Sequence, residues 1–149
     1  MLAGILVLAS CGKTDDLRCA TVTITAPTTE VATLQSYIYA QGITAVADSR
    51  GFFYTIVRLG SGVSPTPCSN VMVDYTGRLT NGQQFDAAAG ATFNLSRLIA
   101  GWQEGLPLIG EGGSIILYLP PSLGYGASAS GNIPPNSITI FTIDLKTVQ

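Results

Sequence analysis

The side chains that could carry chemistry are few and of restricted types. The chain of 149 residues contains no histidine, which excludes Ser-His-Asp and Cys-His mechanisms and most zinc sites. Acid–base chemistry would then fall to carboxylates, and the candidates are Asp86, Glu104 and Glu111. Their spacing does not indicate a catalytic pair, and we expect ordinary solvated roles for Glu104 and Glu111. The glycine clusters GEGGS and GYGASASG lack the Lys-Ser/Thr ending of a phosphate loop, so we interpret them as turns.

The single tryptophan lies in LIAGWQEGL, residues 98–106, between glycines that are poor helix formers. The apolar spacing around Trp102 nevertheless indicates a short helix, whose stability would come from burial rather than from propensity. We expect Gly101 to let a peptide backbone or a ligand approach closely. On its own, Trp102 is either a core residue or a surface that a substrate contacts.

The elements that must position this segment are mostly short strands. VMVDYTGRL alternates apolar and polar residues and precedes Asn81-Gly82, a strong hairpin signal. ITAVADSRGFFYTIVRLG predicts two strands joined by a turn at 48–51, and ATFNL, SIILYLP and ITIFTIDLKTV predict further strands. The sequence therefore predicts an α+β fold, with an antiparallel sheet of about five to six strands curled around one short helix.

A second helix is predicted before the sheet. Val31, Leu34 and Ile38 have helical spacing, with Thr28 or Thr29 as the N-cap and Gly42 as the terminator. Residues 12–27 are polar and β-branched and end at a proline, which indicates a tether with at most a short strand.

Composition favours one packed domain with short extensions. Hydrophobic residues make up 46% of the chain and charged residues 11%, which excludes a disordered chain. The net charge is −2 and the seven basic residues are scattered, so we expect no nucleic-acid binding and no polybasic membrane patch.

The first eleven residues, MLAGILVLASC, are apolar but too few to span a bilayer as a helix. They are similar to the end of a bacterial lipoprotein signal peptide, in which Leu8, Ala9 and Ser10 lead to a lipidated Cys11. The missing basic region indicates that the true start lies upstream. The alternative is an apolar strand with an ordinary cysteine. The lipoprotein interpretation predicts an extracytoplasmic protein, held by lipid at the outer membrane or cell surface of a bacterium.

If Cys11 carries lipid, Cys19 and Cys68 remain as an even pair in an oxidising compartment. A disulfide between them is predicted, and two buried free thiols are the alternative. Neither histidine nor a CxxC spacing accompanies them, so we expect no metal site and no cofactor.

Four motifs from about residue 50 to the end resemble the FKBP (tacrolimus-binding) family of peptidyl-prolyl cis–trans isomerases. VMVDYTGRLTNGQQFD matches V-x-V-x-Y-x-G-x-L-x-x-G-x-x-F-D, and FNLSRLIAGWQEGL matches F-x-L-x-x-V-I-x-G-W-x-E-G. PPSLGYG matches P-x-x-L-A-Y-G, and GNIPPNSITIFTIDL matches G-x-I-P-P-N-x-x-L-x-F-x-V-x-L. Together with the lipoprotein leader predicted over 1–11, the resemblance implies a tether and helix over 12–48 and an isomerase domain over 49–149.

The resemblance implies a proline-binding pocket with Trp102 as its floor. The implied catalytic residues are Tyr75, Asp86, Trp102 and Tyr125, with Asp86 accepting a hydrogen bond from Tyr75 or polarising the pocket edge. The implied substrate-binding residues are Phe85, Leu98, Ile99, Ile133 and Phe141. The backbone N–H of Ile99 and the hydroxyl of Tyr125 would donate hydrogen bonds to the peptide. Phe93, Leu95 and Ile143 are interpreted as core residues.

The sequence departs from the family pattern at three places. Leu98 replaces the usual valine, and Gly124 replaces the alanine before Tyr125. Ala91, in the loop predicted for DAAAGATF, aligns with a pocket aromatic of eukaryotic members, which implies that one wall of the pocket is open.

The resemblance implies a monomeric isomerase without a cofactor. It would act on Xaa–Pro bonds of envelope or exported proteins by non-covalent stabilisation of the twisted amide. Its partners would be proline-containing polypeptides and macrolides such as tacrolimus. The alternatives are a peptide-binding or chaperone module with low turnover, and a purely structural surface domain.

Overall fold

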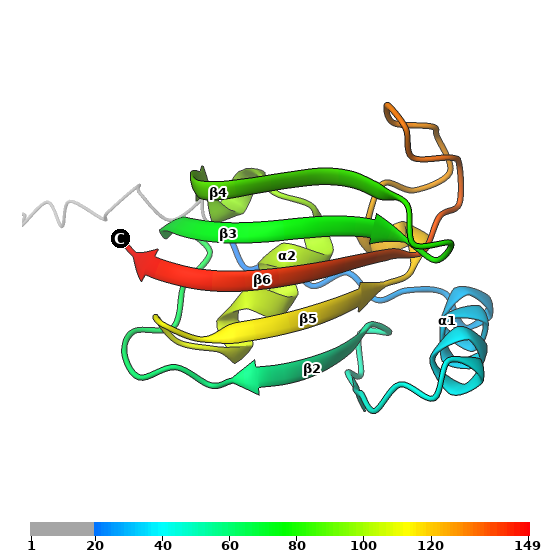
Figure 1. The fold of residues 1–149 in the computed structure, drawn as a ribbon, viewed down its shortest axis with the longest axis horizontal. Helices are drawn as coiled ribbons and strands as arrows, with labels where there is room; N and C mark the ends of the chain where they lie inside the picture. The colour runs from blue at the N-terminus through cyan, green and yellow to red at the C-terminus, as the bar shows by residue number, and fades with distance from the viewer. Residues whose placement is uncertain (1–19) are drawn as a thin grey trace, which may run out of the picture.

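A six-stranded antiparallel sheet organises the computed structural model, which describes residues 20–149 (Figure 1). The strands follow the order β1-β2-β5-β6-β3-β4 across the sheet. In chain order the elements are α1 Thr28–Ala40, β1 Val46–Ala47, β2 Phe53–Arg58, β3 Asn70–Leu79, β4 Gln84–Asn94, the 3₁₀ turn η2 Leu95–Arg97, α2 Ala100–Gly105, the 3₁₀ turn η3 Leu106–Leu108, β5 Ser114–Leu119, the 3₁₀ turn η4 Pro121–Leu123 and β6 Thr139–Val148. The predicted fold is confirmed.

The main core lies between the sheet and α2, which crosses behind the sheet in Figure 1. Alternate residues of the strands point into it, so that Val71 and Val73 on β3 and Phe141 and Ile143 on β6 are almost fully buried. Leu95, just before α2, is also fully buried, so its prediction as a core residue, like that of Ile143, is confirmed.

The opposite face of the sheet is covered at one end by α1. Leu34 and Ile38 form a second apolar cluster with Phe53 of β2 and Tyr118 of β5. The predicted helix and its apolar face are therefore confirmed.

The two ends of α1 differ in how well the sequence predicts them. The N-cap is Pro27, which makes no side-chain hydrogen bond, so the predicted Thr28 or Thr29 cap is wrong. The carbonyl of Pro27 instead accepts from the N–H groups of Glu30 and Val31 in the first turn of the helix. At the other end Gly42 has a φ of 63°, and Ile43 donates to the carbonyl of Ile38, as in a Schellman motif.

The loop predicted for DAAAGATF does not exist, because β4 runs without a break from Gln84 to Asn94. The register between β3 and β4 shifts where Val73 pairs with Ala91 and Tyr75 pairs with Ala88. This bulge holds the extra residues, and the N–H of Gly90 donates to Asp74. A bulge made of small residues lacks the periodicity by which sequence patterns reveal strands.

Residues 20–27 form neither helix nor strand, yet they are held against the domain. Ile24 donates its N–H to Glu104, and Ala26 is buried and donates its N–H to the carbonyl of Arg50. The predictions for the leader, Cys11 and Cys19 lie outside the described residues. Within residues 20–149, no helix is long and apolar enough to cross a membrane.

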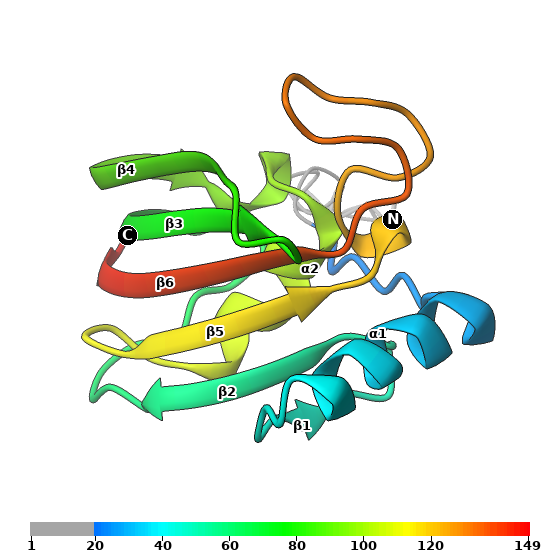
Figure 2. The ribbon, with the colours of Figure 1, turned by 45° about the vertical axis from the view of Figure 1, so that its right-hand side comes forward.

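The connection between β5 and β6 is the longest irregular segment of the described chain. It begins with η4 and then rises beyond the sheet as a loop (Figure 2). Tyr125 lies at its beginning and Ile133 in its middle, so this connection carries two of the residues expected at the proline pocket.

Candidate proline-binding site

A cavity of about 200 Å³ opens between α2 and the sheet. Its wall contains most of the predicted site, namely Tyr75, Asp86, Leu98, Ile99, Trp102, Tyr125 and Phe141, together with Phe93 and Arg97. Residues from β3, β4, β6, α2 and two connections therefore meet at one place. The volume lies below the roughly 300–1,000 Å³ of cavities for drug-sized ligands, and it suits one small ring.

Trp102 is the floor of this cavity and is 4% exposed. Its ring meets Tyr75, Phe93 and Phe141 edge-on, with centroid separations of 5.1, 6.2 and 5.4 Å. These three contacts fix the indole, because edge-to-face aromatic pairs favour a definite mutual orientation. The indole N–H is buried and has no hydrogen-bond acceptor among the described residues. The result is a rigid, apolar surface at the base of the cavity.

Tyr75 and Asp86 face each other from paired strands β3 and β4. The Tyr75 hydroxyl donates a hydrogen bond of 2.7 Å to Oδ2 of Asp86, so one of the two contacts considered for Asp86 is present. Burial raises the pKa of Tyr75, and the bond to Asp86 raises that pKa further. The phenol therefore stays protonated and keeps the carboxylate paired.

Besides the indole N–H, the Ile99 backbone N–H and the Tyr125 hydroxyl at the cavity have no hydrogen-bond partner among residues 20–149. The Ile99 N–H precedes α2 and donates to no acceptor of the described chain, while the Ile99 carbonyl accepts from Trp102. The Tyr125 hydroxyl makes no hydrogen bond there either. Burial, and secondarily the charge of Asp86, raises the pKa of Tyr125, so its hydroxyl stays neutral and able to donate.

Two predicted pocket residues lie outside the cavity wall. Phe85 stands behind it and packs edge-on against Tyr125 and Phe141, at centroid separations of 6.0 and 5.6 Å. Ile133 is 5% exposed within the β5–β6 connection, where it forms an isolated bridge with Ser130. Phe85 therefore supports two residues of the wall from behind, and Ile133 does not line the cavity in this structure.

Phe93, predicted as a core residue, packs against the main core but is only partly buried, because it also faces the cavity. It lines the cavity and meets Tyr75 at 6.0 Å and Trp102 at 6.2 Å between ring centroids. The open wall implied at Ala91 is therefore filled by Phe93, two residues further along β4. The bulge in β4 explains the misalignment, because it shifts the register of the residues that follow it.

Glu104 and Gly101 on α2 also differ from expectation. The predicted solvated role of Glu104 is wrong, because the residue is 2% exposed and Oε1 accepts the Ile24 N–H at 2.7 Å. Burial raises the pKa of the Glu104 carboxyl. Gly101 does not serve ligand approach: a Cβ there would lie 2.4 Å from Leu119 Cδ1, so glycine lets α2 pack closely on β5. Glu111 is half-buried and accepts from the N–H of Val148.

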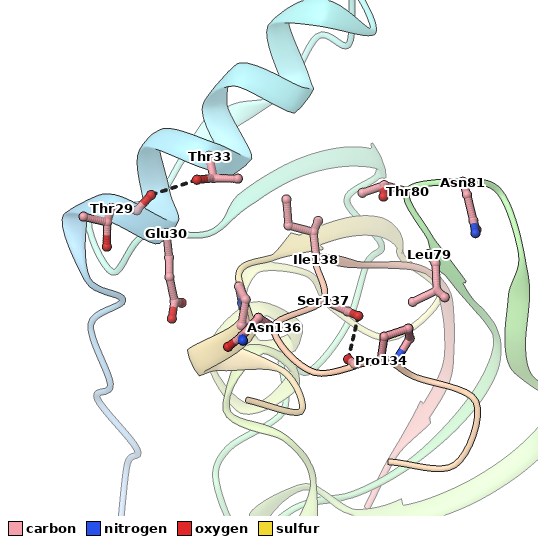
Figure 3. Close-up of a pocket in the computed structure, with 11 residues that line it drawn as sticks. Thr29, Glu30, Thr33, Leu79, Thr80, Asn81, Pro134, Asn136, Ser137 and Ile138 are labelled. Carbon is pink, nitrogen blue, oxygen red and sulfur yellow. Dashed lines mark hydrogen bonds between the residues drawn. The ribbon is translucent and has the colours of Figure 1, made fainter. Parts of the chain in front are cut away.

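A larger cavity of about 550 Å³ lies on the other side of the β5–β6 connection, between α1 and the β3–β4 turn (Figure 3). It is lined largely by hydroxyl, amide and aliphatic groups and contains no aromatic ring. Glu30 reaches from α1 towards the connection, and its Oε2 accepts from both the N–H and the hydroxyl of Ser122 at 2.9 and 2.7 Å. This contact ties α1 to the segment that leads into Tyr125.

The predicted disulfide joins Cys68 to Cys19. Cys68 is disulfide-bonded, whereas its predicted partner Cys19 lies outside the described residues, so the pairing stays a prediction. Among residues 20–149, no three cysteine or carboxylate side chains lie together as a metal-binding group would require.

Fold and cavity together define an FKBP domain: an antiparallel sheet, one short helix carrying the tryptophan floor, and tyrosines at the rim. The family model for FKBP-type peptidyl-prolyl cis-trans isomerases matches residues 62–146, more than half of the chain. The chain therefore belongs to this family.

Several bacterial members of the family are similar to this chain in sequence. The chain is 39% identical over 105 residues to FkpA of Escherichia coli strain K12, covering 68% of this chain and 39% of that protein. It is 41% identical over 106 residues to the Mip isomerase of Coxiella burnetii, covering 68% of this chain and 46% of that protein. The chain thus spans less than half the length of these curated relatives.

Solved structures agree with the sequence comparisons. The crystal structure of Escherichia coli FkpA superposes with a TM-score of 0.74 at 34% identity, covering 82% of this chain and 60% of that chain. A peptidyl-prolyl cis-trans isomerase from Pseudomonas syringae gives a TM-score of 0.72 at 28% identity, covering 83% of this chain and 97% of that chain.

Proposed function

We propose that this chain is a peptidyl-prolyl cis–trans isomerase that acts on Xaa–Pro bonds of envelope or exported proteins. The observation that carries the proposal is the aromatic cavity, whose floor is Trp102 and which presents two unpartnered donors, the Ile99 N–H and the Tyr125 hydroxyl. A proline ring would rest on the indole while the flanking peptide carbonyls accept from these donors. The same cavity would take the proline-like part of a macrolide such as tacrolimus, most of which would lie outside it.

The reaction needs no nucleophile, because no covalent bond is made or broken. Rotation about the Xaa–Pro bond meets a barrier of about 18–20 kcal/mol, since the amide loses its resonance. The twisted amide has less charge separation than the planar one, so an apolar cavity favours it relative to water. Shortening the isomerisation time from tens of seconds to milliseconds requires an activation free energy lower by about 5–6 kcal/mol.

The aromatic wall supplies the larger part of this stabilisation. One hydrogen bond from Tyr125 contributes about 1 kcal/mol net. Removing the more polar planar amide from water costs a few kcal/mol, and this cost is of the size that the lower barrier requires. Binding the proline in a distorted geometry adds to it. Asp86 is then an indirect participant that holds the Tyr75 ring in place.

A protease-coupled assay on a short Xaa–Pro peptide tests the proposal. The wild-type chain should accelerate isomerisation, and Tyr125→Phe should lower kcat/KM about fivefold, as expected for a lost hydrogen bond of about 1 kcal/mol. Tyr39→Phe is the matched control, because Tyr39 is 89% exposed on α1. Peptide binding without acceleration would support the low-turnover binding module instead. Neither binding nor acceleration would support a structural domain.

We further propose that the chain is a monomer anchored by lipid on Cys11 on the extracytoplasmic side of a bacterial membrane. Support comes from Leu8, Ala9 and Ser10 before Cys11 and from the polar GKTDDL after it. Intact-mass measurement of the membrane-expressed chain should show acyl mass on a product that begins at Cys11. A soluble product that retains Met1 would refute the anchor. Sedimentation of the detergent-solubilised chain tests the monomer.

The Cys19–Cys68 disulfide is proposed in the same context. Mass analysis without reductant should find a cross-link between the peptides that contain the two cysteines. If both residues are alkylated without reduction, the pairing is refuted.

A further inference from the structure

The cavity wall contains one cation, Arg97, at the end of the turn η2. Its side chain is exposed, and it makes no ion pair or hydrogen bond with any residue of the described chain. Leu98 and Ile99 follow it directly and line the same cavity. A guanidinium group thus lies two residues before the N–H proposed to bind the peptide.

Most basic residues of the described chain are paired with a carboxylate. Five of its seven basic residues lie within residues 20–149. Three of these five form ion pairs: Arg50 with Asp48 at 2.8 Å, Arg58 with Asp144 at 3.8 Å, and Lys146 with Asp74 at 2.9 Å. The other two are Arg78, on β3 and away from the cavity wall, and Arg97.

The remaining polar groups of the cavity leave the charge of Arg97 available. Asp86 is the one carboxylate of the wall, and it accepts the hydrogen bond of Tyr75 rather than pairing with Arg97. Tyr75 and Tyr125 are neutral phenols. A substrate side chain that approaches η2 therefore meets a single positive group with five N–H donors in a planar fork.

We propose that Arg97 determines substrate specificity, selecting peptides with an aspartate or glutamate directly before the proline. The inference rests on the proposed isomerase function. A peptide bound to the Ile99 N–H runs past Arg97, and a carboxylate is the group that matches the guanidinium fork in charge and shape. Because the contact is open to solvent, the preference is moderate, about two- to fivefold in kcat/KM. Salt weakens it, since exposed charges are screened.

Three peptides that differ only before proline test the inference: Glu–Pro, Gln–Pro and Lys–Pro, assayed at low ionic strength. The wild-type chain should turn over Glu–Pro about two to five times faster than Gln–Pro. In Arg97→Gln the ratio should fall to about one, and in Arg97→Glu the order should reverse, with Lys–Pro preferred. Arg97→Lys keeps the charge and should keep a reduced preference, while Arg78→Gln should leave the ratio unchanged.

The outcomes separate this inference from the isomerase proposal. If the wild-type chain turns over Gln–Pro at least as fast as Glu–Pro, or if a preference for Glu–Pro persists in Arg97→Gln, the proposed role of Arg97 is overturned. Neither result would contradict the isomerase proposal. Failure to accelerate any peptide would overturn the isomerase function. In that case fluorescence of Trp102, the single tryptophan, measures peptide affinity, and an equal affinity for Glu–Pro and Gln–Pro overturns the inference. Urea unfolding of each variant establishes that it is folded.

Discussion

The Tyr75 hydroxyl donates to Asp86 Oδ2 at 2.7 Å, across two paired strands that form one side of the cavity around Trp102. The same Tyr75 ring meets Trp102 edge-on at 5.1 Å. The carboxylate therefore acts on the cavity floor through the tyrosine, by fixing the ring that in turn fixes the indole. The hydrogen bond therefore positions the Tyr75 ring, and no proton has to pass between the two oxygen atoms.

Tyr75→Phe tests this coupling. The variant keeps the ring and loses the hydrogen bond, so the free energy of unfolding should fall by about 1 kcal/mol. The kcat/KM should fall several-fold, because the ring is freer and Asp86 has lost its partner. Urea unfolding and the peptide assay measure the two effects. Tyr39→Phe removes an exposed hydroxyl of the same kind, and a loss of the same size there would contradict the argument.

Trp102→Leu should lower the free energy of unfolding and abolish peptide turnover. Truncating a buried aromatic costs about 3 kcal/mol, and the shortened side chain no longer provides a flat floor. Phe52→Leu is the matched control, because Phe52 is fully buried in the same core but lies outside the cavity wall. Both variants should lower the urea midpoint, and only Trp102→Leu should abolish peptide turnover. Equal losses of turnover would mean that Trp102 acts through stability alone.

Glu30 links the N-terminal helix to the site. Glu30→Ala removes two hydrogen bonds to Ser122, three residues before Tyr125, so we expect about 1–2 kcal/mol less stability and a lower kcat/KM. Glu30→Gln keeps an acceptor and should have smaller effects. Thr33 lines the same cavity between α1 and the β3–β4 turn but bonds only within its own helix, so Thr33→Ala should change neither quantity (Figure 3). An unchanged kcat/KM in Glu30→Ala would show that α1 does not influence the site.

Local patterns in the sequence predicted much of this fold. The hairpin at Asn81-Gly82, the strand alternation and the termination of α1 at Gly42 depend on nearby residues, and the structure contains all three. The motif order placed Trp102, Tyr75 and Tyr125 around one cavity, as the structure does.

What the sequence did not predict depends on long-range contacts. The bulge in β4, which brings Phe93 rather than Ala91 to the cavity, follows from pairing with β3 and leaves no periodic signal. The buried Glu104 accepts the N–H of Ile24, which lies 80 residues away in the sequence, and no local pattern indicates such a contact. The position of Arg97 at the cavity is not predicted either, because a single exposed arginine has no distinctive sequence pattern.

Gly101→Ala tests whether glycine serves packing rather than ligand approach. Its Cβ would lie 2.4 Å from both Cδ atoms of Leu119, so α2 or Leu119 must shift. Overpacking typically costs about 1–3 kcal/mol, which exceeds the roughly 1 kcal/mol gained in helix propensity. Leu119→Val should recover part of this loss in the double variant, giving a non-additive cycle in urea unfolding. Additive losses would indicate that the two residues do not press on each other.

Glu104→Gln tests the buried carboxyl through its pH dependence. Burial raises the pKa of Glu104 above its ordinary value of 4.5, so the folded chain holds this proton more tightly than the unfolded chain. The contribution of Glu104 to stability is therefore fully present at low pH, and it falls as the pH rises through the folded-state pKa. Glutamine does not titrate, but its side-chain oxygen can still accept the N–H of Ile24. The free energy of unfolding of the variant minus that of the wild type should therefore increase between pH 4 and pH 7.

Urea unfolding of both proteins across this range measures that difference. Asp48 has a pKa lowered by its bond to Arg50, so its contribution alone would change with pH in the opposite sense. A difference for Glu104→Gln that stays constant or decreases as the pH rises would show that the carboxyl is ionised at no cost, and that the segment around Ile24 does not bury it in solution.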